Sequence, residues 1–172
     1  MLNRPAAEEY NAYYDGYIQH VPEGDLFELM AAQVDELNEV FDGVSNDVAE
    51  TLHAPYTWTL KQLLGHLIDA EKIFGCRAHR FGCGDLQALP GMEQNQYVDG
   101  LDFSGCQLGD LVAELQHLRR GNLAFFKRLS NEAFDHVGTA DGNPISVRAL
   151  AYIMHGHVAY HLVIARKRLA GS

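Results

Sequence analysis

SVRALAYIMHGHVAYHLVIARKRLA, the segment from Ser146 to Ala170, carries apolar residues at the three- and four-residue spacing of an amphipathic helix. Its apolar stripe consists of Val147, Leu150, Ala151, Met154, Val158, Leu162 and Ala165. His157 and His161 are four residues apart within this stripe, so both imidazoles leave the face that is expected to be buried. Because buried imidazole nitrogens need polar partners, the pair indicates that another group meets them inside the fold.

Three other segments show the same periodicity, so the sequence predicts four long helices. They cover approximately residues 25–42, 57–80, 107–130 and 146–169. The first begins with Asp25 and Glu28, which resemble a capping box. These lengths predict an all-α fold, a four-helix bundle formed by a single domain over residues 1–172. Short β-like pieces are too few for us to expect a sheet.

The segments between the four predicted helices show weaker sequence patterns than the helices do. Tyrosines within residues 1–23 are spaced as in a short amphipathic helix, and Asp141-Gly142-Asn143-Pro144 is a turn signature. Residues 82–106 form the longest weakly patterned region and contain Pro90 and five glycines. A loop of this length in a compact domain usually has a function or spans a distance.

Composition limits the functional classes. The chain has 172 residues, 47% of them hydrophobic, and a net charge of −10, which disfavours nucleic-acid binding. The absence of a long apolar run and of a signal-peptide pattern predicts a cytoplasmic protein without membrane contact. We interpret Cys76, Cys83 and Cys106 as free thiols in a reducing compartment.

A third histidine, His66, lies at the edge of the apolar stripe of the 57–80 helix. If that helix is a neighbour of the last one, His66, His157 and His161 can meet inside the bundle. Three neutral imidazoles suit a divalent ion such as Zn²⁺, Ni²⁺, Fe²⁺ or Mn²⁺, and three protein ligands leave coordination positions open for water or substrate. The alternative is that these histidines are hydrogen-bonded core residues without a metal.

Several other polar residues are candidates for a place at or near this site. Asp69, one turn after His66, is a candidate to orient that imidazole, with an exposed helical carboxylate as the equal alternative. Glu71 is a weaker candidate, and Gln33 is expected at the edge of the core rather than against a substrate. His155 is predicted on the opposite, exposed face of its helix. The remaining histidines are expected in loops or on outer faces: His20, His53, His79, His117 and His136.

Known catalytic motifs are absent. Val158 follows His157, so the general base of the His-Glu-x-x-His metalloproteases is missing. The paired Glu and Glu-x-x-His motifs of ferritin-like bundles are missing too, as are nucleophile-elbow, P-loop and dinucleotide fingerprints.

The chain nevertheless resembles the DinB/YfiT-like superfamily, in particular its DinB_2 branch. The resemblance rests on YDGYIQHVPEGDL (14–26), WTLKQLLGHLIDAEKIFGCR (58–77), LPGMEQNQYV (89–98) and SVRALAYIMHGHVAYHL (146–162). It implies a four-helix bundle of non-standard, left-handed up-and-down arrangement, a divalent metal on His66, His157 and His161, and compatibility with a homodimer. Relatives include thiol-dependent S-transferases and an isomerase, which implies a small-molecule substrate and a low-molecular-weight thiol cosubstrate.

Two departures limit this resemblance, since Val158 and Asn95 stand where relatives often carry acids. The leading hypothesis is therefore a divalent-metal-dependent enzyme that activates a thiol or water against a small electrophile, as a thiol S-transferase or a hydrolase. The alternative is a non-catalytic metal-binding protein with a stress or interaction role.

Overall fold

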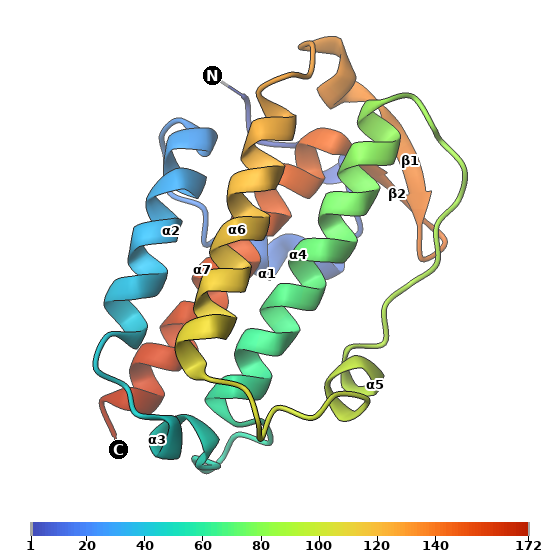
Figure 1. Ribbon diagram of the computed structural model, residues 1–172. Helices are drawn as coiled ribbons and strands as arrows, with labels where there is room; N and C mark the ends of the chain where they lie inside the picture. The colour runs from blue at the N-terminus through green and yellow to red at the C-terminus, as the bar shows by residue number, and fades with distance from the viewer. Residues whose placement is uncertain (1, 172) are drawn as a thin grey trace.

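The computed structural model describes residues 2–171 and contains the four predicted long helices (Figure 1). They are α2 (Leu26–Phe41), α4 (Leu60–Gly82), α6 (Leu108–Phe126) and α7 (Val147–Leu169). The predicted all-α four-helix bundle is therefore confirmed. Shorter helices form as well: α1 (Asp15–Ile18), α3 (Asn46–Glu50), α5 (Gln94–Asp99), and the 3₁₀ turns η1 (Ala7–Glu9), η2 (Ala12–Tyr14) and η3 (Glu132–Asp135). Among these, only a short helix within residues 1–23 was predicted.

The order of the helices around the bundle explains the long connections. Both α4 and α2 pack against α6 and α7, so α2 and α4 lie across the diagonal from each other. Helices α2 and α7 run in one direction and α4 and α6 in the other (Figure 1). Because α4 and α6 are parallel neighbours, the chain must return along the bundle between them. Residues 83–107 make this return on the outside and carry α5.

The expectation that no sheet forms was wrong. Strands β1 (Val137–Ala140) and β2 (Asn143–Ser146) pair antiparallel, with Ala140 opposite Asn143. Asp141 and Gly142 between them have φ angles of 52° and 73°, as in a type I′ hairpin turn. The turn signature was therefore informative, but four-residue strands are too short to show a clear alternation.

The N-terminal segment is also different from the single short helix expected for residues 1–23. Two 3₁₀ turns and the one-turn helix α1 lie against α7 instead. The closest approach is at Gly156, where a Cβ atom would lie 2.0 Å from the carbonyl oxygen of Tyr17. Gly156 thus allows two backbones to touch at the level of the histidines.

A polar layer separates the apolar interior into two clusters. One cluster contains Leu26, Phe74 and Leu150, and the other contains Leu37, Leu64 and Leu162.

Between the two clusters, Arg119 donates to both carboxylate oxygens of Glu71 at 2.9 Å and to the carbonyl of Met154. Gln33 accepts from Arg119 and donates to the carbonyl of His155, so it is a fully buried core residue and does not lie at the edge of the core, where it was expected.

No helix in residues 2–171 is both long and apolar enough to cross a bilayer.

The Arg119–Glu71 pair is expected to dominate the stability of this layer. Arg119→Met should lower the free energy of unfolding by about 3–5 kcal/mol, because it leaves the buried Glu71 carboxylate without a cationic partner. Replacing both residues by methionine should cost less than the single change. Denaturant unfolding measures both effects, and Arg120→Met, an exposed neighbour on α6, is the control. An Arg119→Met protein as stable as this control would contradict the prediction.

A glycine pair tests the contact of α1 with α7. Gly156→Ala should destabilise the protein by about 1–3 kcal/mol, because its methyl group must displace the backbone of Tyr17. Gly121→Ala, in α6 with no atom within 4 Å of the added carbon, should stabilise by about 0.5–1 kcal/mol. Thermal unfolding of both variants gives the comparison, and an unchanged Tm for Gly156→Ala would disprove the contact.

Candidate metal centre

Three histidines from two neighbouring antiparallel helices meet in the polar layer. His66 extends from α4, and His157 and His161 extend from α7. One nitrogen from each lies within 4.8 Å of the others, and Nε2 of His66 is 3.0 Å from Nε2 of His157. All three side chains are buried. The structure therefore brings together the three residues that the sequence singled out.

Burial keeps these imidazoles neutral. Desolvation lowers the pKa of His66 to about 4 and that of His161 to about 3, and the neighbouring His66 adds to the shift at His161. The pKa of His157 is also well below its usual value, through desolvation and then the two other histidines. A neutral imidazole offers a lone pair, which is the form that binds a metal.

Several imidazole nitrogens of the cluster have no hydrogen-bond partner among the described residues, which fits a metal ion. Within residues 2–171, Nδ1 of His66 and both ring nitrogens of His161 are buried without a hydrogen-bond partner. Tetrahedral coordination with Zn–N bonds of about 2.0–2.1 Å separates ligand nitrogens by roughly 3.3 Å. Ligand atoms already within 4.8 Å of one another need only small ring rotations to reach this arrangement. The residues present therefore fit a divalent transition metal.

Aromatic rings surround the histidines. Tyr17 and Phe74 pack edge-on against His157, with ring centroids 4.9 and 6.0 Å away. Trp58 lies 5.0 Å from His66, and Tyr160 lies 5.1 Å from His161. These rings limit water access and fix the imidazole orientations.

One side of the cluster opens into a cavity of about 280 Å³. His66 and His157 form part of its wall. The rest of the lining comes from the N-terminal segment, α4, the return connection and the hairpin: Tyr13, Tyr14, Tyr17, Ala70, Phe74, Arg77, Met92, Glu93, Gln94 and Asp141. A small molecule in this cavity would reach two of the three histidines directly.

The carboxylates considered from the sequence do not orient the histidines here. Asp69 is buried, but no hydrogen bond joins it to His66, and its Oδ2 has no partner among the described residues. Glu71 is held by Arg119 and Asn122. Asn95 is exposed and outside the cavity lining, and Val158 packs in the apolar core.

The prediction that His155 is exposed was wrong. Its side chain is 4% exposed, and both ring nitrogens lack a partner in residues 2–171. Burial, and then the charge of Arg119, lowers its pKa to about 3. The cause is the central position of α7, which is covered by α4 on one side and by α1 and α2 on others.

The other histidines and the cysteines lie outside the cluster. His20, His79 and His117 are exposed, as expected. His136 is instead half-buried, with Nδ1 2.9 Å from the carbonyl oxygen of Phe81, and His53 contacts Arg168. The thiols of Cys76, Cys83 and Cys106 are free.

Sequence reasoning missed the residues that shape the cavity. Tyr17, Arg77 and Asp141 come from three separate segments, and their proximity depends on how the connections fold over the bundle. The tyrosine cluster in residues 10–17 is a visible signal in the sequence, but its spacing alone predicts only a helix stripe.

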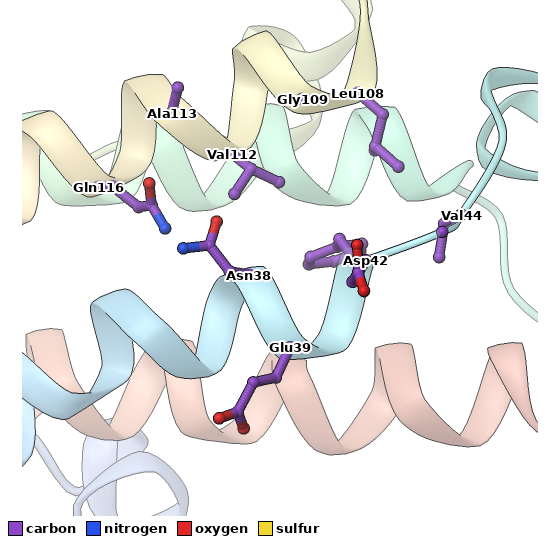
Figure 2. Close-up of a pocket in the computed structure, with 11 residues that line it drawn as sticks. Asn38, Glu39, Asp42, Val44, Leu108, Gly109, Val112, Ala113 and Gln116 are labelled. Carbon is purple, nitrogen blue, oxygen red and sulfur yellow. The ribbon is translucent and has the colours of Figure 1, made fainter.

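A larger hollow of about 540 Å³ lies elsewhere, between the end of α2 and the start of α6 (Figure 2). Asn38 and Gln116 point toward each other across it, whereas Glu39 points away. None of the three clustered histidines lines it. Glu39 and Asp42 are the carboxylates in its lining, which contains no histidine or cysteine among the described residues. The histidine cluster is therefore the stronger candidate for a functional site.

Comparisons with known proteins identify the fold and the family. YfiT from Bacillus subtilis, a solved structure described as "a probable metal-dependent hydrolase with an unusual four-helix bundle topology", is similar with a TM-score of 0.68 and 18% identity. The alignment covers 98% of this chain and 94% of that one, so it shows a shared fold. No curated protein matches the sequence. The family model of the DinB superfamily matches residues 29–165, and the chain therefore belongs to the DinB superfamily.

Proposed function

We propose that this protein is a divalent-metal-dependent enzyme whose ion is held by His66, His157 and His161. The observation that carries the proposal is a trio of neutral, buried imidazoles with unpaired nitrogens beside a cavity. Zn²⁺, Ni²⁺, Fe²⁺ and Mn²⁺ all suit this donor set. When bound, such an ion is a Lewis acid that favours the deprotonated form of a water or thiol.

The protein's own residues would prepare the site for this chemistry. Burial keeps the three imidazoles deprotonated, and Tyr17, Phe74 and Trp58 fix their orientation. The cavity admits a small electrophile next to His66 and His157. Hydrolysis and thiol S-transfer both need this arrangement, and the two reactions differ in the nucleophile that enters.

A non-catalytic metal-binding protein is the second candidate. That role would require protein atoms to fill the space next to the ion. The cavity lined by His66 and His157 favours the enzyme.

Metal content tests the ligand set. Native protein, or apoprotein incubated with the four ions in turn, should hold one ion per chain. His66→Ala, His157→Ala and His161→Ala should each weaken binding by more than about a hundredfold, because losing a partner of a ligand alone costs 10–100-fold. Equilibrium dialysis followed by elemental analysis measures this.

His117→Ala, on the exposed surface of α6, is the matched control and should retain the ion. A wild-type chain that binds none of these ions, even after incubation, would reject the proposal.

Acid should destabilise the metal-free protein. Each buried histidine has a pKa in the folded state below its ordinary value of 6.5. Below pH 6.5 the unfolded chain therefore binds protons that the folded chain does not bind until about pH 3–4. The free energy of unfolding should fall between pH 7 and pH 5, by up to about 1.4 kcal/mol per pH unit for each such histidine.

Urea unfolding at several pH values in the presence of a chelator measures this slope. His161→Gln should reduce the slope, and His117→Gln should leave it unchanged. A wild-type stability that is constant from pH 7 to pH 5 would contradict the assignment of buried neutral histidines.

A further inference from the structure

The cavity beside the histidines contains a buried cation without an anionic partner. Arg77 is 4% exposed, and its Nη2 donates to the carbonyl oxygen of Pro90 at 2.7 Å. None of the ion pairs in residues 2–171 includes it. By contrast, the equally buried cations Arg119 and Lys61 each pair with a glutamate. Glu93 and Asp141 line the same cavity, but neither forms an ion pair with Arg77. Because a buried charge is normally compensated by a close anion, Arg77 indicates that a ligand supplies one.

A second buried arginine, Arg168, also lacks an ion pair within residues 2–171, but it does not line the cavity beside the histidines. Arg168 lies over the ring of Tyr56, 5.0 Å from its centroid, and contacts His53 near the C-terminal end of α7. Arg77, in contrast, lines the same cavity as two of the three clustered histidines.

The position of Arg77 relates it directly to the candidate metal centre. His66, Ala70, Phe74 and Arg77 follow one another along one face of α4, and all four line the cavity. The Phe74 ring lies 6.0 Å from the ring of His157 and 5.8 Å from the guanidinium carbon of Arg77. The Phe74 ring is therefore in contact range of both the Arg77 guanidinium and the histidine cluster.

Tyr14 adds a neutral hydrogen-bond donor to this end of the cavity. Its ring packs against Phe74 with centroids 6.1 Å apart, and it lines the cavity. Burial raises the pKa of Tyr14, and the charge of Arg77 opposes this shift. A phenol O–H next to a planar guanidinium is a suitable pair of donors for two oxygen atoms.

The rim of the cavity limits how much negative charge can enter. Glu93 and Asp141 also line it, and they would repel a phosphate dianion more strongly than a singly charged carboxylate. We propose that Arg77 and Tyr14 bind a carboxylate group of the substrate, whose reactive end lies at the histidines. This inference rests on the proposed function.

Bifunctional probes test whether one molecule spans both groups. Eleven residues of helix rise about 16 Å, and the arginine side chain leans back toward the helix N-terminus. The probes are therefore a length series of mercapto acids, from mercaptoacetate to 6-mercaptohexanoate, each matched with the mercapto alcohol of equal length. They are titrated into the Co²⁺-loaded full-length protein, and the thiolate-to-cobalt charge-transfer absorption gives each Kd.

At the chain length that reaches Arg77, the acid should bind about tenfold to hundredfold more tightly than the alcohol, because it gains charge-assisted hydrogen bonds. Arg77→Leu should reduce this advantage to less than about threefold, and Arg77→Lys should retain part of it. Arg80→Leu removes a cation that is one turn away and already paired with Asp85, so it should retain the full advantage.

Two outcomes would overturn the inference alone: acids that bind no more tightly than alcohols at every length, or an advantage that persists in Arg77→Leu. A protein that shows no cobalt absorption at all would reject the proposed function, and the inference with it. If Arg77→Leu fails to fold, the Kd values of acids and alcohols in the wild-type protein and in Arg77→Lys still test the inference.

Discussion

The structure depends on the removal of three imidazoles from water at mid-height of the bundle. His66, His157 and His161 are buried together, a place that would ordinarily hold leucine or phenylalanine. Keeping polar rings there divides the apolar interior in two and requires other polar groups at the same level, such as the Arg119–Glu71 pair. A core of this kind gives up some hydrophobic stabilisation and gains a defined set of lone pairs.

The helix order determines what surrounds these lone pairs. Since α4 and α6 run in the same direction as neighbours, the connection between them must cover the length of the bundle. This connection, together with the N-terminal turns and the hairpin, supplies most of the cavity wall. The helices thus hold the three histidines, while the connections shape the space in which a substrate would lie, a division typical of scaffolds that carry sites on loops.

Much of the fold and the cluster of three histidines could be predicted from the sequence, because long amphipathic stripes have a strong period and His157 and His161 interrupt one of them. His155 could not be placed in this way, since the first half of α7, as far as Val158, is covered on several sides and has no exposed face. The β1–β2 hairpin was too short to show alternation. Arg77 and Tyr14 look like ordinary helix and loop residues until the chain folds, because their proximity is a long-range property.

His66 and His157 are 91 positions apart in the sequence, so a bound ion would have a structural role as well as a chemical one. An ion shared by α4 and α7 would act as a reversible cross-link that closes a loop of more than half the chain. Such a closure restricts the unfolded ensemble in the manner of a disulfide, and the restriction grows with loop length. All three cysteines of this chain are free thiols. A bound metal would therefore be the cross-link between the two halves of the domain that a disulfide provides in other proteins.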